Sequence, residues 1–289
     1  MTEWTAAALP SFSGRTVIIT GANSGLGLVT ARELARVGAD VVLAVRNTGK
    51  GDEAAASMTG NVAVRRLDLQ DLASVRDFAA ATERVDVLVN NAGIMAVPYA
   101  RTVDGFESQI GTNHLGHFAL TNLLLPKITD RVVTVSSFMH IFGRINIDDL
   151  NWKARPYSAW PAYGQSKLAN LLFTSELQKR LSQAGSPVRA LAAHPGYSHT
   201  NLQGQSGRKL GDAVMALGGQ YFATDADFGA RQTLYAVAAD LPGDTFVGPR
   251  YAMRGPTGPA WRTRRARDTS MAAALWDLSE RLTGTTFAL

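Results

Sequence analysis

The sequence predicts an α/β fold in which helices cover both faces of a doubly wound parallel β-sheet. Short apolar runs of the kind found in buried parallel strands recur along the chain, and helical patterns separate them. Glycine-rich and polar motifs follow these runs, and ligands of doubly wound sheets bind at this edge, beyond the carboxyl ends of the strands. The chain has 289 residues, of which 46% are hydrophobic, so we expect one three-layer domain over residues 1–289.

The first strand is predicted over residues 15–19, and a helix with one apolar face follows over residues 26–37. The turn between them carries glycines with the spacing Gly-x-x-x-Gly-x-Gly. Gly21 permits a sharp turn, Gly25 lets backbone N–H groups approach a pyrophosphate, and Gly27 allows the helix to lie close to the sheet. The turn therefore indicates a phosphate site at the positive end of the helix, although a tight turn without a ligand has the same pattern. The residues assigned to this site are Gly21, Asn23, Ser24, Gly25, Leu26 and Gly27.

The second strand, residues 40–45, is followed by Arg46 and Asn47 instead of an acidic residue. An Asp or Glu at the end of this strand would bind the ribose hydroxyls of NAD, whereas an arginine pairs with the 2′-phosphate of NADP through a bidentate contact. Lys50 adds a second positive charge nearby. The sequence therefore favours NADP(H) over NAD(H) as the cofactor of such a site.

Four more strands are predicted over residues 61–67, 85–89, 131–135 and 187–193. Asp68 and Leu69 follow the first of these, and the Asp68 carboxylate is placed to contact an adenine edge. A helix cap is the alternative role for Asp68, as it is for Asp71 and Ser74. The next strand ends in small residues that let the backbone lie beside a flat ligand, namely Asn91, Ala92 and Gly93.

The helix after Pro161 carries Tyr163 and Lys167, which lie on one face because they are four residues apart. A phenol has a pKa of about 10, so proton exchange near neutral pH requires about 4 kcal/mol of preferential stabilisation of the phenolate. A nearby ammonium group supplies part of this free energy. For an isolated Tyr-x-x-x-Lys, the alternative is an interfacial tyrosine beside a surface lysine. The pair is therefore a candidate acid/base site that needs support from the other motifs.

In this order the motifs resemble those of the short-chain dehydrogenases/reductases, a family with a Rossmann-like fold. The resemblance extends from about residue 14 to the terminal helix. It rests on the glycine turn that begins at Thr20, Asp68, residues 90–93, Asn113, the set Ser137, Tyr163 and Lys167, and residues 195–200. Within the family, the chain looks most like the retinol dehydrogenase and WW-domain oxidoreductase branch at residues 112–118, 138–160 and 166–170. We expect neither the membrane anchor of that branch nor a WW domain.

The resemblance implies a role for each residue of the candidate site. Tyr163 would be the general acid/base, and Lys167 would hold the nicotinamide ribose and lower the pKa of the tyrosine. Ser137, chosen over Ser136 because it matches the family pattern, would hydrogen-bond to the reacting carbonyl oxygen. Asn113 would support a water relay. The same pattern implies cofactor contacts for Pro195, Gly196 and Thr200.

Two apolar and aromatic stretches are candidates for the substrate side of the site. The first is an insert near residues 138–160, with Met139, Ile141, Phe142, Trp152 and Trp160. The second, a predicted lid near residues 197–222, contains Leu202, Leu210, Met215 and Tyr221. A hydrophobic pocket under a mobile lid and simple packing beneath a long loop explain these side chains equally well. A C-terminal helix near residues 269–283 is expected to pack on the core.

Other features argue against several classes of function. Arginines gather at residues 250–267 of this basic chain, but no nucleic-acid motif accompanies them, and a solvated basic loop accounts for them. The chain has no cysteine, hence neither disulfides nor sulfur metal sites. His114 and His117 share a helical face without an acidic or further histidine ligand, which favours hydrogen bonding over a metal site. Ser206 and Lys209 match Ser-x-x-Lys but lack the companion Lys-Thr-Gly motif of a hydrolase.

No apolar run reaches the length of a membrane span, and residues 1–13 lack the features of a signal peptide. We therefore expect a soluble, cytoplasmic NADP(H)-dependent oxidoreductase that acts on a carbonyl or alcohol group of a fairly apolar small molecule. The alternative is a non-catalytic NADP(H)-responsive binding protein on the same fold, against which the intact Ser137, Tyr163 and Lys167 set argues. Nucleic acid and metal are not expected as partners, and a homo-oligomer is compatible with the sequence.

Overall fold

A computed structural model gives the structure of residues 4–196 and 226–289. Its centre is an eight-stranded sheet in the order β3-β2-β1-β4-β5-β6-β7-β8, and neighbouring strands are parallel except for the last pair. The predicted doubly wound sheet is therefore confirmed. The strands are β1 (Thr16–Thr20), β2 (Asp40–Val45), β3 (Val62–Arg66), β4 (Val85–Asn90), β5 (Ile128–Val135), β6 (Arg189–Ala193), β7 (Phe246–Pro249) and β8 (Thr257–Pro259).

Both faces of the central strands are buried, which explains the uninterrupted apolar runs in the sequence. In β1, Val17 and Ile19 belong to one core cluster and Ile18 to the other, as the two-residue period of a strand requires. All three side chains are completely buried. A run of consecutive apolar residues is thus what a central strand of a three-layer fold needs.

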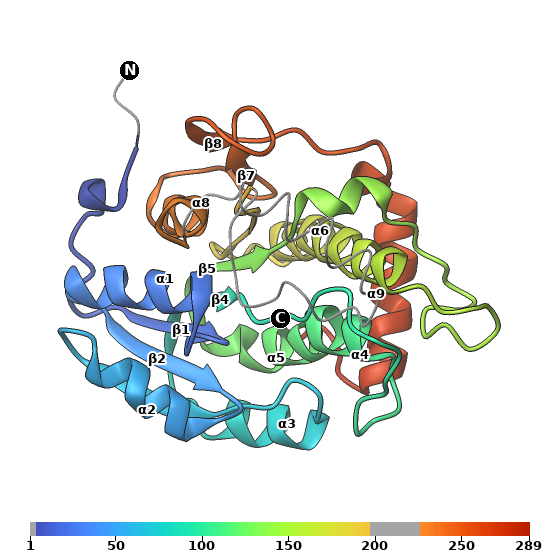
Figure 1. The fold of residues 1–289 in the computed structure, drawn as a ribbon, viewed down its shortest axis with the longest axis horizontal. Helices are drawn as coiled ribbons and strands as arrows, with labels where there is room; N and C mark the ends of the chain where they lie inside the picture. Colours follow the sequence, from blue (N-terminus) through green and yellow to red (C-terminus); the bar gives the residue numbers. More distant parts are fainter. Residues whose placement is uncertain (1–3, 197–225) are drawn as a thin grey trace.

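Helices form the two outer layers (Figure 1). The core on one face includes residues of α1 (Gly25–Arg36), α2 (Thr48–Ala56) and α8 (Ala226–Ala238). The core on the other face includes residues of α3 (Leu72–Ala80), α5 (Gly116–Leu124), α6 (Ala159–Gln183) and α9 (Thr269–Thr283). A short helix, α4 (Ser108–Ile110), and a π-helical segment, Gly111–Leu115, lead into α5. Short 3₁₀ helices lie at Ala6–Ala8, Leu125–Lys127, Phe138–Phe142 and Arg265–Arg267.

The chain order reverses at the centre of the sheet, because β1 lies between β2 and β4. From β1 the chain builds outward to β3 on one side, and it then returns to build from β4 to β8 on the other. Such a reversal leaves a crevice beyond the carboxyl ends of the two central strands, where the connections diverge. In this chain those ends are Thr20 in β1 and Asn90 in β4.

The predicted elements match the structure best at the carboxyl ends of the strands. β2 has the predicted bounds, whereas β5 begins at Ile128 instead of residue 131, because Ile128 pairs with Val85 of β4. The strands β7 and β8 had no counterpart in the prediction. The terminal helix α9 has the predicted bounds and packs Trp276 against Phe118 and Phe173.

The basic stretch near the C-terminus is only partly a solvated loop. Arg264 and Arg265 are exposed, as predicted. Arg262 instead forms an ion pair with Asp244 at 2.7 Å and donates to Ser175 Oγ at 3.0 Å. It therefore ties the segment after β8 to α6, and its charge has a structural partner.

Candidate active site

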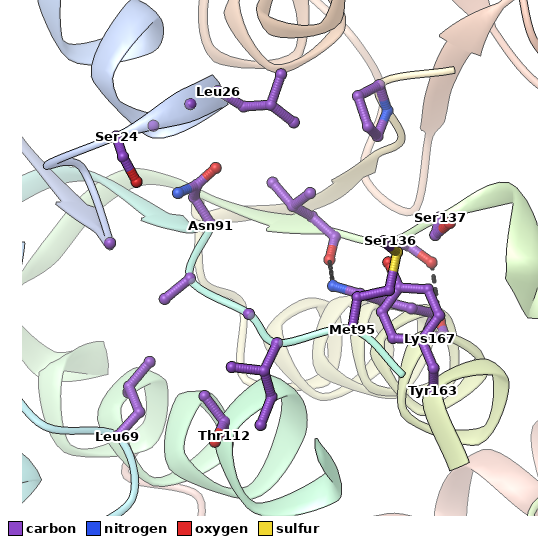
Figure 2. A pocket seen from close by; sticks show the side chains of 18 of the residues that line it. Ser24, Leu26, Leu69, Asn91, Met95, Thr112, Ser136, Ser137, Tyr163 and Lys167 are labelled. Atoms are coloured by element: carbon purple, nitrogen blue, oxygen red, sulfur yellow. Dashed lines mark hydrogen bonds between the residues drawn. The ribbon is translucent and has the colours of Figure 1, made fainter. Parts of the chain in front are cut away.

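A cavity of about 570 Å³ lies beyond the carboxyl ends of the strands (Figure 2). Its wall includes residues that follow each strand from β1 to β6, so the order reversal of the sheet positions it. Asn113 lies outside the wall, and Thr200 and the predicted lid at residues 197–222 fall outside the described residues. The other predicted site residues all line the cavity: Gly21, Asn23, Ser24, Gly25, Leu26, Gly27, Arg46, Asp68, Leu69, Asn91, Ala92, Gly93, Ser137, Tyr163, Lys167, Pro195 and Gly196.

The glycine turn touches the end of β4 so closely that side chains do not fit. Gly21 has φ of +66°, and a Cβ there would lie 2.9 Å from Ala92 Cβ. A Cβ on Gly27 would lie 2.5 Å from Asn91 Nδ2 and 2.8 Å from Gly21 O. Gly27 therefore allows close contact with the residues after β4 and with the turn itself.

The start of α1 faces the cavity without a capping side chain. Ser24 is the N-cap residue, and its hydroxyl makes no capping hydrogen bond. The first backbone N–H groups of a helix have no partner within the helix, and they carry its partial positive charge. Together with the glycine cradle, this end of α1 fits the pyrophosphate of a dinucleotide.

The acid/base candidates meet at the other end of the cavity (Figure 2). Lys167 Nζ lies 5.7 Å from the centre of the Tyr163 ring and donates to Val135 O at 3.0 Å. Ser136 is committed elsewhere, because its hydroxyl donates to Lys167 O at 2.8 Å. Ser137 instead forms a side-chain hydrogen bond with Tyr163. This arrangement supports the choice of Ser137 over Ser136.

Burial dominates the protonation of both groups. It raises the pKa of Tyr163 to about 12, although the hydrogen bond from Ser137 opposes this shift. Burial also lowers the pKa of Lys167 to about 8. Burial is the larger cause of the Tyr163 shift, and the hydrogen bond with Ser137 is the contact that lowers this pKa. The lowering of the Tyr163 pKa by Lys167 stays a prediction. At neutral pH, Tyr163 carries its proton.

Asn113 lies in the π-helical segment behind the cavity wall and is completely buried. Its Oδ1 accepts from Ile94 N, and its Nδ2 donates to Ile94 O, both at 2.9 Å. A Cβ on Gly93 would lie 3.1 Å from Asn113 Oδ1 and 3.5 Å from Lys167 Nζ. Asn113 thus supports the stretch of wall that faces Lys167.

The carboxylates after β3 have separate roles. Asp68 lines the cavity, and its Oδ1 accepts from Gln70 N at 3.0 Å, which holds its own turn. Asp71 is the N-cap of α3 and accepts from Ala73 N at 2.9 Å. Ser74 is not a cap, because it lies inside α3 and accepts from Asp68 N. The helix-cap alternative thus applies to Asp71 alone.

The predicted substrate insert divides between wall and core. Trp152 is buried and packs against Tyr157, with Arg155 over its ring at 3.7 Å, so it supports the loop from beneath. Ile141 is also absent from the wall. The insert contributes Phe138, Met139, Phe142 and Trp160 to the wall.

Sequence reasoning missed two methionines of the wall, Met95 and Met253. Met95 stands two residues after Gly93, so the motif that ends at Gly93 was a signal for it. Met253 lies between β7 and β8, and without those strands nothing in the sequence connects it to the site.

The comparisons with known proteins agree with this fold and site, which are those of a dinucleotide-binding oxidoreductase. A family model described as "short chain dehydrogenase" matches residues 15–211. The chain belongs to the short-chain dehydrogenase family. It is therefore an NAD(P)-dependent oxidoreductase that acts on alcohol or carbonyl groups of a small molecule.

Similar proteins cover nearly the whole chain. Retinol dehydrogenase 13 of Homo sapiens is 43% identical, with 97% of this chain and 88% of that protein aligned. Retinol dehydrogenase 12 of Mus musculus is 42% identical, over 94% and 87% of the two chains. The crystal structure of an uncharacterized protein from Mycobacterium paratuberculosis is 68% identical, covers 100% of both chains and has a TM-score of 0.90. The resemblance to the retinol dehydrogenase branch is thus confirmed.

Within residues 4–196 and 226–289, no helix has both the length and the apolar character needed to cross a membrane.

Proposed function

We propose that this protein transfers a hydride between NADP(H) and the carbonyl or alcohol carbon of a fairly apolar small molecule. The observation that carries the choice of cofactor is Arg46, which follows β2, is exposed and lines the cavity. Among the residues that the structure describes, none forms an ion pair with Arg46. Its guanidinium is therefore available to a phosphate.

The neighbours of Arg46 support this assignment. Asn47 caps α2 by accepting from Lys50 N at 3.0 Å, so it does not compete for the ribose. Asp68 is the carboxylate of the cavity wall that lies nearest to Arg46 in the sequence. It follows β3, the edge strand beside β2. The end of β2 thus presents a cation where an NAD-binding site would present an acid.

The proton chemistry falls to Tyr163 and Ser137. When bound, the nicotinamide ring supplies or accepts the hydride. Tyr163 donates its proton to the substrate oxygen during reduction and recovers it during oxidation. Ser137 hydrogen-bonds to the same oxygen and stabilises the charge that develops there. Lys167 is assigned to the nicotinamide ribose.

The rest of the wall supports the proposed substrate class. Apolar side chains line it beside the polar groups, namely Ile94, Met95, Phe138, Met139, Phe142, Trp160 and Met253. Such a lining binds an apolar molecule and leaves the hydroxyls of Ser137 and Tyr163 to orient its oxygen. The names of the similar retinol dehydrogenases agree with an apolar alcohol or aldehyde as substrate.

The cofactor assignment is tested by measuring the Kd of NADPH and NADH by calorimetry. A charge-assisted hydrogen bond contributes roughly 1.5 to 3 kcal/mol, so Arg46→Asp should weaken NADPH binding by at least about tenfold and leave NADH binding little changed. Arg66→Asp is the matched control, because Arg66 ends β3, is exposed and lies outside the wall. Tighter binding of NADH than NADPH by the parent protein would contradict the proposal.

The reaction is tested by following NADPH absorbance with a panel of aldehydes and ketones. We expect higher kcat/KM for bulky apolar carbonyls than for small polar ones, because the wall is largely apolar. NADPH binding without turnover of any carbonyl or alcohol would favour the non-catalytic alternative.

A further inference from the structure

His117 is buried behind the site in the first turn of α5, and both of its ring nitrogens have partners. Nδ1 lies 3.1 Å from Asn113 O, and Nε2 lies 2.9 Å from Thr20 Oγ1. A carbonyl oxygen can only accept, so Nδ1 carries a proton. Burial lowers the pKa of His117 to about 4, which keeps the ring neutral and leaves Nε2 as an acceptor.

The hydroxyl of Thr20 supplies the proton that Nε2 accepts. Its oxygen accepts from the backbone N–H groups of Asn91 and Ala92, each at 2.9 Å. The single hydroxyl proton then points to His117 Nε2 at 2.9 Å, since the other acceptor, Val89 O, is 3.4 Å away. The donor and the acceptor are therefore fixed in each hydrogen bond that leads from the backbone of Asn91 and Ala92 through Thr20 and His117 to Asn113.

Asn113 extends this chain of hydrogen bonds to the catalytic helix. Its Nδ2 donates to Ser166 Oγ at 2.9 Å, and Ser166 Oγ donates to Tyr163 O at 2.8 Å. This series of hydrogen bonds thus begins at the cofactor side of the cavity and ends on the turn of α6 that carries Tyr163. His117 is its central member.

We propose that His117 is a positioning residue that holds the turn at Asn91 and Ala92 in register with the helix that carries Tyr163. The inference rests on the proposed function. The relative position of the turn and the helix affects the reaction because the cofactor and Tyr163 must act on the same substrate molecule. His117 is not part of the cavity wall, so its effect is on geometry alone. A displacement of reacting groups by about 1 Å can lower turnover by about a hundredfold.

Three substitutions separate the two hydrogen bonds of the ring. His117→Asn keeps a donor near the position of Nδ1, His117→Gln keeps a polar group near Nε2, and His117→Leu removes both. We expect kcat with NADPH and an apolar carbonyl to fall by about tenfold to a hundredfold in His117→Leu and His117→Asn, because both lose the bond to Thr20 that links the turn to α5. His117→Gln, which keeps a polar group near Thr20, should restore most of it. The KM for NADPH should change little, because Thr20 still binds Asn91 and Ala92.

His114 provides the matched control. It lies three residues earlier, is 1% exposed like His117, and bonds through Nε2 to Ser279 Oγ of α9 at 2.9 Å. His114→Leu should destabilise the protein without changing kcat. Equal losses of kcat in His114→Leu and His117→Leu would overturn the inference. So would equal kcat in His117→Asn and His117→Gln, because a role in folding alone predicts that result.

The tautomer of His117 is a measurement that does not depend on turnover. The chain has five histidines, so long-range ¹H–¹⁵N spectra of the parent and His117→Asn identify the ring. We expect the Nδ1–H tautomer at neutral pH, and the Nε2–H tautomer would overturn the inference. A parent protein that turns over no carbonyl would contradict the proposed function, while this spectrum would still decide the inference.

Discussion

Tyr163 is protonated at neutral pH because its phenol is buried, and a protonated phenol is the form that donates to a substrate oxygen. We expect Tyr163→Phe to lower kcat by at least about a hundredfold, the lower scale of an acid/base contribution. The Kd of NADPH should stay close to that of the parent, because one hydroxyl is removed. Steady-state kinetics and calorimetry measure the two effects, and near-native turnover would remove Tyr163 from the reaction.

The raised pKa of Tyr163 also predicts opposite pH dependences for the two directions of reaction. Oxidation needs the phenolate, and below the pKa its population rises about tenfold for each pH unit. We expect kcat for alcohol oxidation to increase with pH through the neutral range, while kcat for carbonyl reduction stays level there because the phenol remains protonated. Parallel pH profiles in both directions would show that another group limits the proton step.

The sequence could predict that Ser137, Tyr163 and Lys167 come together at one cavity, but it could not predict their protonation. Spacing places Tyr163 and Lys167 on one helical face, and the family pattern selects Ser137. The pKa depends on how much water each group loses on folding, and residues far apart in the chain decide that. This is why the pKa of Tyr163 is raised although an ammonium lies close to its ring.

The glycine turn between β1 and α1 allows a prediction about a single substitution. An added methyl at Gly27 would collide with Gly21 O and Asn91 Nδ2, so Gly27→Ala must open the contact between the turn and the end of β4. We expect the free energy of unfolding to fall by about 1 to 3 kcal/mol and NADPH binding to weaken. Gly258→Ala is the control, because a Cβ on Gly258 in β8 meets nothing within 4 Å. Unchanged nucleotide affinity in Gly27→Ala would separate the turn from the cofactor.

Strands and helices differ in how far the sequence determines them. The buried strands could be predicted because burial on both faces demands an apolar run, as in β1 and β2. The π-helical segment before α5 could not, because nothing in the residue types of Gly111–Leu115 distinguishes a π-helical turn from an α-helical one. Its wider register appears only in the bond from Gly116 N to Gly111 O. The short β8, whose residues Thr257–Pro259 contain glycine and proline, likewise carries no apolar signal.

For the whole molecule, buried histidines predict a loss of stability in acid. Burial lowers the pKa of His114 to about 3, that of His117 to about 4 and that of His194 to about 3. The unfolded chain binds these protons near its ordinary pKa of about 6.5, so each contribution is full above that pH and decreases toward the folded-state pKa. At pH 5, each of these three histidines therefore lowers the free energy of unfolding by about 2 kcal/mol relative to pH 7.

The histidine prediction is tested by urea denaturation at pH 7 and pH 5. In the parent, the free energy of unfolding should fall markedly between the two conditions. In His114→Leu the fall should be smaller by about 2 kcal/mol, because one of the three groups no longer takes up a proton on unfolding. An identical fall in parent and variant would assign the acid sensitivity to other groups.

The residues that line the cavity are spread along the chain from Gly21 to Met253. A fragment that lacks either end of this range therefore does not contain the complete binding site. A nucleotide held there stabilises the complete fold and not its parts, and at a hundred times its Kd it adds about 2.7 kcal/mol to the free energy of unfolding. Degradation of such a protein tracks the population of its opened forms. The amount of this enzyme in a cell should therefore follow the local supply of its nucleotide, with protein turnover slowing when that supply rises.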